Sequence, residues 1–391
     1  MTNLTEDDIE QNLIDLLQSE GYAYFHGTEL DGVRSGFDQV VIEGEFKASL
    51  QRLNPNLDEL ALADAYSQVL DLSSNDVMTN NEQFHNMLTS GVTIEVFENG
   101  QSVGKQVELV DFNTIQNNHF WVVNQFVIKE NNQSKRLDVI LFVNGLPLVV
   151  IELKSATSEK ATLERAYTQI QNYKTAIPTV FYYNALCVIS DGLDARTSSI
   201  SAPFSRFLVW KSPEKTENGL LPELQILAER MLNKSALLKV IRFNTVFESE
   251  EVKDEKTGLL QQVKIKKIAA YHQFYVVEKA IASTLRALSD NKTADEVREA
   301  PESYGLPSVK TQEKGDRRAG VVWHTQGSGK SLSMVFYAGQ LVVEPKMKNP
   351  TIVILTDRND LDDQLFETFG NCISLLRQKP VQAQDRADLK K

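Results

Sequence analysis

The stretch Arg136-Leu-Asp-Val-Ile-Leu-Phe-Val-Asn-Gly-Leu-Pro-Leu-Val-Val-Ile-Glu-Leu-Lys154 decides the fold of the first half of this 391-residue chain. Two runs of β-branched and other apolar residues flank Asn144-Gly145, a dipeptide that strongly favours a hairpin turn. Apolar runs at Phe120–Ile128 and Ala185–Ser190 predict further strands, and residues 159–175, rich in Ala, Glu, Lys and Gln, predict a helix. The sequence therefore predicts an α/β domain with a buried central sheet.

Charged side chains stand on both strands of this hairpin. Asp138 opens the first run, and Glu152 and Lys154 end the second. Residues two apart on a strand share a face, so Glu152 and Lys154 point the same way. Two carboxylates on neighbouring strands can hold Mg²⁺ against a phosphate, and a nearby lysine can orient or deprotonate an attacking water. The candidate catalytic residues are Asp138, Glu152 and Lys154, with both carboxylates as metal ligands. The alternative is that these residues are only the solvated charges of an edge strand.

The turn decides whether these side chains meet. A two-residue Asn144-Gly145 turn in a regular ladder places Asp138 opposite Ile151, pointing away from Glu152. A three-residue loop, Val143–Gly145, with Gly145 in a left-handed bulge, places Asp138 on the same face as Glu152. We therefore predict that loop, or another single bulge between residues 138 and 152, with the two carboxylates about 4 to 6 Å apart.

Other Glu-x-Lys triplets compete with this assignment. Glu45/Lys47 is the most serious, because Asp38 precedes it, but Gly44 interrupts its short strand-like run and no partner strand adjoins. Glu251/Lys253 lies in a charged, loop-like segment, and Glu344/Lys346 has Pro345 inside it. The hairpin triplet is the one whose context fits a metal site.

A second motif lies in the segment Val321-Val-Trp-His-Thr-Gln-Gly-Ser-Gly-Lys-Ser331, which runs from an apolar stretch through two glycines into a helical pattern. Backbone N–H groups of such a loop close around a β-phosphate, the lysine neutralises phosphate oxygens, and the next hydroxyl can hold Mg²⁺. His324 stands where the general pattern has its first glycine. The segment predicts an ATP site formed by Thr325, Gly327, Ser328, Gly329, Lys330 and Ser331.

The second half of the chain alternates helical and strand-like patterns, as in a parallel α/β sheet. Helices are predicted at 271–289 and 330–343, and buried strands at 319–323 and 351–356. The sequence after the phosphate-binding loop contains no D-E-x-H carboxylate motif. We therefore expect this half to be an incomplete ATPase lobe that stops before Walker B and hydrolyses ATP weakly.

Loop-like composition at residues 211–219 and 248–258 predicts a connection between domains. We place the boundary at residue 245, which gives domains 1–245 and 246–391. Thr5 and Asp8 predict a capping box at the start of an amphipathic helix that opens the first domain.

The hairpin and the phosphate-binding segment, together with Asn118–Phe126, resemble the restriction (R) subunit of type I restriction-modification enzymes. The resemblance covers most of the chain and implies a PD-(D/E)xK nuclease domain, with Leu137 in place of the proline, followed by a partial RecA-like lobe of a superfamily 2 helicase. It implies Mg²⁺ and ATP as cofactors, and double-stranded DNA with the modification and specificity subunits as partners. The expected activity is ATP-driven translocation and cleavage of unmethylated DNA away from the recognition site.

The same resemblance suggests further site residues. Gln169 and Tyr173, at i and i+4 on one helix face, resemble a Q-x-x-x-Y motif that positions DNA in such nucleases. Glu10 matches an acidic residue that can add to the metal site, or it is a solvated helix glutamate. Gln273 resembles the adenine-reading glutamine of superfamily 2 helicases, and the strand ending at Thr356 resembles their motif Ia, which touches the DNA backbone.

Composition limits the remaining possibilities. A net charge of −12 argues against a generally basic DNA-binding surface, so DNA contact must be local. Two isolated cysteines and the acidic start predict a reduced, cytoplasmic protein, and no apolar run reaches the roughly 18 residues that a membrane span needs. The alternatives are a repair-type helicase-nuclease, disfavoured because the nuclease comes first here, and a DNA-dependent ATPase module whose nuclease fold does not cleave.

Overall fold

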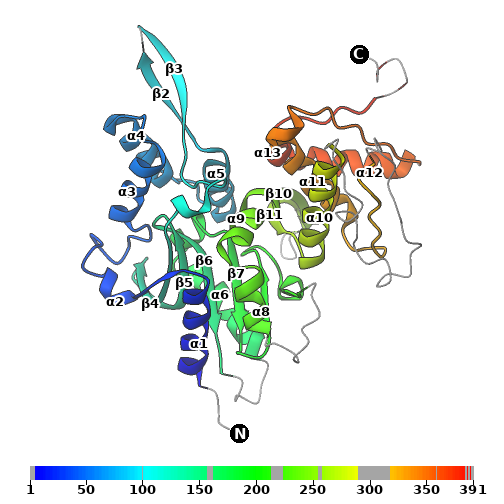
Figure 1. Ribbon diagram of the computed structural model, residues 1–391. Helices are drawn as coiled ribbons and strands as arrows, with labels where there is room; N and C mark the ends of the chain where they lie inside the picture. Colours follow the sequence, from blue (N-terminus) through cyan, green and yellow to red (C-terminus); the bar gives the residue numbers. More distant parts are fainter. Residues whose placement is uncertain are drawn as a thin grey trace. The chain divides into compact units, whose positions relative to one another are not determined.

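The structure is a computed structural model, and it describes residues 5–98, 100–155, 162–212, 223–253, 258–288, 318–357, 359–383, 385 and 388. The chain divides into two compact units, Met1–Tyr271 and His272–Lys391 (Figure 1). This division falls later than the boundary at residue 245 that composition suggested, so a hairpin at residues 245–268 belongs to the first unit.

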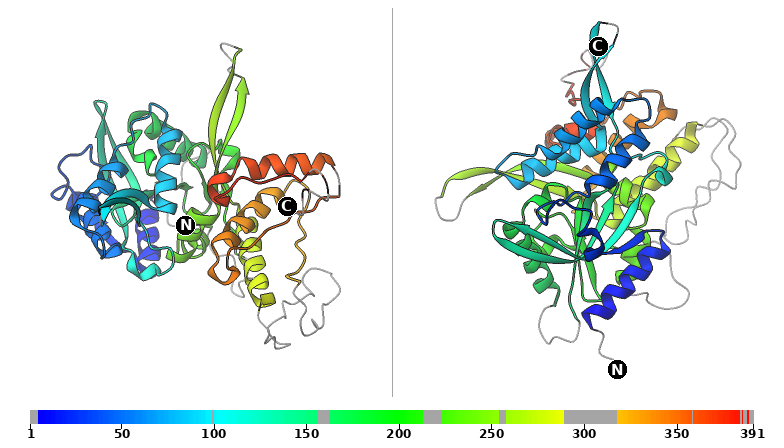
Figure 2. Two further views of the ribbon diagram at one scale, coloured as in Figure 1. Left: turned by 90° about the horizontal axis from the view of Figure 1, so that it is seen from above. Right: turned by 90° about the vertical axis from the view of Figure 1, so that its left-hand side faces the viewer.

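A seven-stranded sheet forms the centre of the first unit, in the order β1-β4-β5-β6-β7-β8-β9 (Figures 1 and 2). β1 is parallel to β4 and β6 is parallel to β7, whereas the other neighbours are antiparallel. The strands are β1 (Ala23–His26), β4 (Phe120–Glu130), β5 (Gln133–Val143), β6 (Leu146–Leu153), β7 (Leu186–Ser190), β8 (Ala195–Ser198) and β9 (Leu208–Val209).

Burial explains why these residues form the central strands. Every residue of β6 and β7 is buried, as expected for strands covered on both faces. The strands predicted at 120–128, 137–154 and 185–190 are thereby confirmed, with β6 ending at Leu153. Glu152, the second-last residue of the buried strand β6, places a carboxylate where water cannot solvate it, which is costly unless a partner compensates the charge.

Helices cover this sheet. The capping box predicted at Thr5 and Asp8 is present at the start of α1, which packs against β1, β4 and β6. α6 packs against β5, β6 and β7. The helices of the first unit are α1 (Glu6–Ser19), α2 (Gly27–Leu30), α3 (Glu43–Leu53), α4 (Glu59–Leu70), α5 (Val77–Ser90), α6 (Thr162–Ala176), α7 (Thr179–Tyr182), α8 (Glu223–Arg230) and α9 (Lys234–Phe243), with short 3-10 turns η1 (Ile115–Asn117) and η2 (Phe204–Arg206).

Two hairpins stand apart from the sheet: β2 (Val92–Glu98) with β3 (Gln101–Val107), and β10 (Thr245–Lys253) with β11 (Leu260–Ile268) (Figure 1). The loop predicted at 248–258 is wrong over residues 248–253, because opposite charges across the ladder support a strand: Lys267 pairs with Glu248 and Glu250. The buried Lys266 ammonium fixes this hairpin to the unit by donating to Asn81 Oδ1 and to the carbonyl of Asn184.

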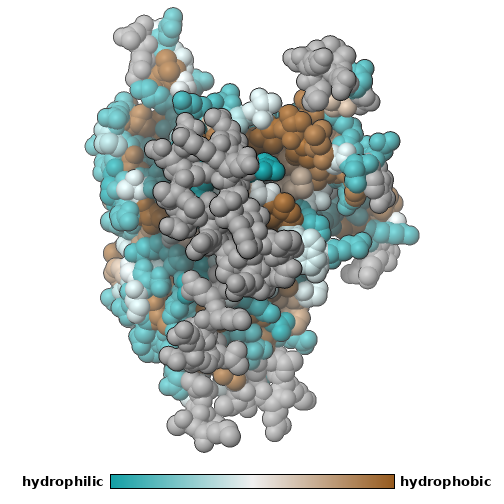
Figure 3. Space-filling view, turned by 45° about the vertical axis from the view of Figure 1, so that its right-hand side comes forward, coloured by the Kyte–Doolittle hydropathy of each residue, from teal (hydrophilic) through white to brown (hydrophobic). Residues whose placement is uncertain are grey.

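The second unit contains α11 (Lys330–Val343), α12 (Asn359–Gly370), α13 (Ile373–Leu376) and η5 (Pro345–Met347), and α10 (Tyr271–Leu288) begins at the boundary. The helices predicted at 271–289 and 330–343 are confirmed, apart from residue 289, which lies outside the described residues. The strands predicted at 319–323 and 351–356 are wrong, because neither segment pairs with a neighbouring strand within the described part of this unit. The surface of the molecule carries hydrophobic side chains among hydrophilic ones (Figure 3). In the two unpaired segments the exposed hydrophobic side chains include Val321, Trp323 and Leu355, which are 95 %, 75 % and 84 % exposed.

Candidate active site

The β5–β6 hairpin carries the predicted catalytic residues, and its turn differs from the one expected. Asn144 and Gly145 have φ values of +53° and +80°, and Val143 pairs with Leu146, so the turn has two residues. The three-residue loop is therefore wrong. The alternative, a single bulge between residues 138 and 152, is confirmed, because Phe142 pairs with Pro147 while Leu141 pairs with Val149, which leaves Leu148 as the extra residue.

This bulge sets the register of the carboxylates. Val139 pairs with Ile151, so the next position along the ladder places Asp138 opposite Glu152, and opposite residues of antiparallel strands share a face. The backbone N–H of Leu153 donates to Asp138 Oδ2 over 2.8 Å. Asp138 is thus tied to the end of strand β6, which carries Glu152 and is followed by Lys154.

Oxygen atoms of Asp138, Glu152 and Leu153 lie around the ammonium group of Lys154. Lys154 Nζ lies 2.6 Å from Glu152 Oε1 and 3.9 Å from Asp138 Oδ2, and it donates to the carbonyl of Leu153 over 2.7 Å. The side chains of Tyr173 and Asp138 also interact with Glu152 by hydrogen bonding, and within the described residues no further donor reaches its buried Oε2. Two buried carboxylates side by side fit a divalent cation.

The electrostatics reflect this crowding of negative charge. Burial, with the Asp138 charge adding to it, raises the pKa of Glu152 to about 8, against the effect of Lys154. Burial also raises the pKa of Asp138. Burial alone would lower the pKa of Lys154, but the Glu152 and Asp138 carboxylates outweigh it, so the pKa of Lys154 rises and its amine stays protonated at neutral pH.

The predicted pair on α6 lies at this site. Tyr173 is buried, and its hydroxyl donates to the carbonyl of Arg136, two residues before Asp138, over 3.0 Å. Burial raises the pKa of Tyr173, the Glu152 charge raises it further, and a hydrogen bond with Gln169 lowers it. The structure therefore brings Gln169 and Tyr173 together beside the two carboxylates.

Glu10 of α1 also approaches the site. Its Oε1 accepts from Asn124 Nδ2 over 2.7 Å and its Oε2 from Gln125 Nε2 over 2.6 Å. Burial raises the pKa of Glu10, the two amide hydrogen bonds lower it, and the Asp138 charge raises it. No group of three His, Cys, Asp or Glu side chains within the described ranges is arranged to hold a metal ion, so Glu10 does not form a three-carboxylate cluster with Asp138 and Glu152.

Sequence reasoning missed Asn124 and Gln125. Neighbouring residues of a strand are expected on opposite faces, so nothing in the pattern indicated that both amides bind one carboxylate. The competing triplet Glu45/Lys47 lies on helix α3, where Lys47 pairs with Glu43 over 2.5 Å and Glu45 contacts His119 over 2.8 Å. It has no strand geometry and is not part of this site.

The segment 321–331, which was predicted to bind phosphate, has the backbone that its glycines suggested. Gly327 and Gly329 have φ values of +78° and +76°, and α11 begins at Lys330. Lys330 Nζ donates to the carbonyls of His324 and Thr325 over 3.0 and 2.9 Å, so the ammonium lies against its own loop. A loop of this form at a helix N-terminus can bind an anion.

Gln273 reaches the same loop. It is buried on α10, and its Nε2 donates to the carbonyl of Gly329 over 3.0 Å. The positive φ of Gly329 favours glycine, and a Cβ there would lie 2.6 Å from that nitrogen, so the Gln273 side chain would have to move. Ser328, whose carbonyl lies 3.1 Å from His272 Nε2, and Ser331, in the first turn of α11, complete the predicted set.

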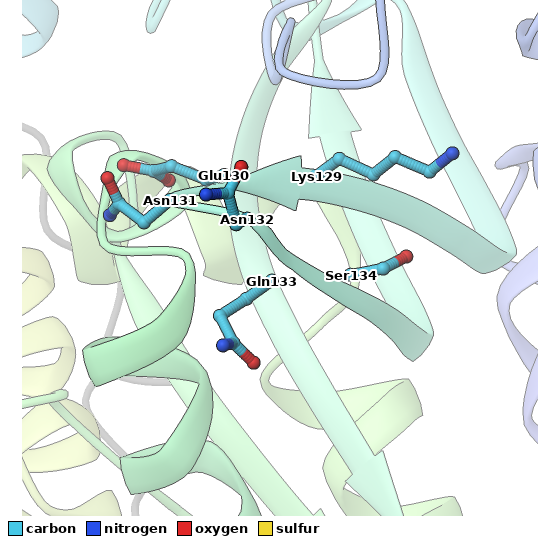
Figure 4. Close-up of a pocket in the computed structure, with 6 residues that line it drawn as sticks. All are labelled: Lys129, Glu130, Asn131, Asn132, Gln133 and Ser134. Carbon is cyan, nitrogen blue, oxygen red and sulfur yellow. The ribbon is translucent and has the colours of Figure 1, made fainter.

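An open hollow elsewhere in the first unit is lined by Lys129–Ser134, at the turn between β4 and β5 (Figure 4). None of the predicted site residues lines it. Among the described residues, no helix is long and apolar enough to cross a membrane.

Comparisons with known proteins agree with the two-part organisation. The family model described as "Type I restriction enzyme R protein N terminus" matches residues 3–206, and that of the SWI2/SNF2 ATPase matches residues 272–391. The HindI endonuclease subunit of a type I restriction enzyme, from Haemophilus influenzae, is 42% identical, over 99% of this chain and 35% of its own length.

A relative from Methanocaldococcus jannaschii, provisionally named the MjaIXP endonuclease subunit of a type I restriction enzyme, is 31% identical over 95% of this chain and 34% of its own length. The chain thus spans about a third of the length of these curated relatives. Since the first family model covers just over half of the chain, the protein belongs to the type I restriction enzyme R proteins and carries their N-terminal region.

Proposed function

We propose that the first unit is a PD-(D/E)xK nuclease domain that cleaves double-stranded DNA with Mg²⁺. The observation that carries the proposal is the convergence of Asp138, Lys154 and the buried Glu152 at the ends of two neighbouring strands. Asp138 and Glu152 would hold the cation, which would polarise the scissile phosphate and lower the pKa of a bound water.

The role of each side chain follows from its contacts and charge. Lys154, whose ammonium lies beside both carboxylates in the metal-free protein, would orient or deprotonate the attacking water. Gln169 and Tyr173 would position the DNA strand beside the carboxylates. Tyr173 is itself held by its hydrogen bond to the carbonyl of Arg136.

The second unit would bind ATP as part of a RecA-like lobe of a superfamily 2 translocase. The left-handed Gly327 and Gly329 and the start of α11 at Lys330 support a phosphate site. Lys330 would bind the β- and γ-phosphates, Ser331 would hold Mg²⁺, and Gln273 would contact adenine. The match to a SWI2/SNF2 ATPase supports a motor function for this region.

In the complete protein, nuclease and motor would act together with modification and specificity subunits, cutting unmethylated DNA at a distance from the recognition site. The test is a cleavage assay of the complete subunit with those partners, on methylated and unmethylated DNA, with and without ATP and Mg²⁺. We expect cutting of unmethylated DNA only, lost in Asp138→Asn. DNA binding and ATP hydrolysis without any cutting would instead identify a non-cleaving nuclease fold.

A further inference from the structure

Strand β4 contains a backbone irregularity beside the candidate active site. Gln125 has a φ of +53°, a left-handed conformation that non-glycine residues in strands rarely adopt. The ladder to β5 pairs Asn124 with Val139 and Phe126 with Leu137, but Gln125 has no pair. By the same register, the position opposite Gln125 is that of Asp138.

This irregularity brings two amides to one carboxylate. In a regular strand the side chains of Asn124 and Gln125 would point to opposite faces. Here both donate to Glu10, each to a different oxygen, over 2.7 and 2.6 Å. The amide of Asn124 is itself oriented, because its Oδ1 accepts from the hydroxyl of Tyr24 over 3.2 Å.

A glycine makes room for the unusual backbone. Gly27, at the start of α2, lies against β4, and a Cβ at this position would come within 2.5 Å of the carbonyl oxygen of Gln125. A backbone oxygen cannot move away as a flexible side chain can. The left-handed conformation of Gln125 is thus enclosed by its neighbours, and strain of this kind persists where the surrounding structure fixes it.

The donors that hold Glu10 are neutral. Amides orient a carboxylate without cancelling its charge, whereas Lys or Arg would form an ion pair with it. Gln125, which donates to Glu10, lies opposite Asp138 in the ladder, so the Glu10 carboxylate is held near Asp138. Mg²⁺ commonly keeps several waters and binds only one or two carboxylates directly, and a further carboxylate can then bind it through such a water.

We propose that Gln125, together with Asn124, is a positioning residue that aims the Glu10 carboxylate at water bound to the divalent cation held by Asp138 and Glu152. This inference rests on the proposed nuclease function. It assigns to the left-handed backbone of β4 the role of presenting two consecutive amides to one carboxylate, and it makes Glu10 an indirect rather than a direct metal partner.

The test measures Mn²⁺ binding to the complete protein without DNA, from the electron paramagnetic resonance signal of free Mn²⁺. Loss of a partner that orients a metal site typically weakens affinity roughly 10- to 100-fold. We expect Gln125→Gly, which suits the left-handed φ but lacks the amide, to weaken Mn²⁺ binding about tenfold. Gln125→Asn tolerates the same φ and is one methylene too short, so it should have the same effect if the glycine variant does not fold.

The matched control is Asn131→Gly. Asn131 has a φ of +49° in the exposed turn after β4, so this substitution makes the same kind of backbone change away from the site and should leave Mn²⁺ affinity unchanged. Glu10→Gln should weaken Mn²⁺ binding like Gln125→Gly, and the double variant should be no weaker than either single variant, because both act through one group.

The role of Gln125 would be overturned if the loss of Mn²⁺ affinity in the double variant equalled the product of the two single losses. Wild-type Mn²⁺ affinity in both Gln125 variants would overturn it as well. If Asp138→Asn also kept wild-type Mn²⁺ affinity, the proposed metal site itself would fail, and with it this inference. Asp138→Asn therefore separates failure of the proposed nuclease from failure of the positioning role.

Discussion

Lys154 Nζ lies 2.6 Å from Glu152 Oε1, so a buried residue of β6 forms an ion pair with the first residue after this strand. The Asp138 carboxylate belongs to the same charged cluster, 3.9 Å from the Lys154 ammonium. One ammonium faces two carboxylates in an environment that favours their neutral forms. The stability of the protein should therefore depend on pH and on divalent cations.

The first prediction concerns pH. The pKa of Glu152 is raised from its ordinary value of 4.5 to about 8, so the native state keeps a proton that the unfolded chain releases above pH 4.5. This contribution to stability is fully present below pH 4.5 and is lost as pH rises through about 8. The free energy of unfolding of the metal-free protein should fall across that range, as measured by urea titration at several pH values.

Glu152→Gln removes the titrating group and keeps the shape of the side chain. At pH 8 without metal, we expect this variant to unfold at a higher temperature than the wild type. The unfolding temperature should rise by roughly 2–4 °C for each kcal/mol by which removal of the buried charge increases the free energy of unfolding. Added Mg²⁺ should stabilise the wild type more than the variant. An unchanged pH slope in Glu152→Gln would mean that another group causes the dependence.

The second prediction separates Lys154 from the metal ligands. Lys154→Ala should lower the DNA cleavage rate about 10²- to 10⁴-fold, the usual range for loss of a group that assists proton transfer. Mn²⁺ binding should persist, because Asp138 and Glu152 remain. Lys47→Ala serves as the control, since Lys47 belongs to a Glu-x-Lys triplet on helix α3, and its cleavage rate should equal that of the wild type.

The third prediction concerns the motor. In the complete subunit, Lys330→Ala should abolish ATP hydrolysis and, with it, ATP-dependent DNA cleavage, because the ammonium that would neutralise the phosphates is removed. Mn²⁺ binding at Asp138 and Glu152 should not change. Lys346→Ala, in the short turn η5 after α11, provides a control of equal charge change. ATP-dependent cutting at the wild-type rate in Lys330→Ala would contradict the assignment of this loop.

Sequence patterns predicted the buried strands of the first unit well, because β4 to β7 contain long apolar runs bounded by turn residues. They also predicted the helix that begins at Lys330, after a loop whose Gly327 and Gly329 have positive φ values. The charged strand β10 was missed, since its support comes from cross-strand partners on β11 such as Lys267. The strands predicted in the second unit failed for a related reason: an apolar run forms a strand only when neighbouring strands satisfy its backbone.

The candidate site was predictable in its residue types but not in its geometry. Because side chains alternate between the two faces of a strand, Asp138 and Glu152 could share a face only with one bulge between them. The residues themselves did not indicate that this bulge would fall at Leu148 rather than in the turn. The amides that hold Glu10 could not be found from periodicity, because Gln125 breaks the alternation of strand β4. Both features depend on how neighbouring strands and helices pack.

The last prediction tests the bulge by shortening β6 by one residue or by two. Deleting Leu148 removes the extra residue, so Leu141 still pairs with Val149 and Asp138 stays opposite Glu152. Deleting Val150 as well shortens the regular ladder by one residue, which places Glu152 opposite Val139 and turns it to the other face.

Both variants lose buried apolar residues from the same strand, so both should unfold at a lower temperature than the wild type. Mn²⁺ binding is therefore measured at a temperature below both unfolding midpoints. The Leu148 deletion should keep measurable Mn²⁺ affinity and residual cleavage, whereas the double deletion should lose both, because its carboxylates can no longer reach one cation. Equal loss of Mn²⁺ binding in two folded variants would mean that register does not control this site, and the argument that the bulge unites Asp138 with Glu152 would then be wrong.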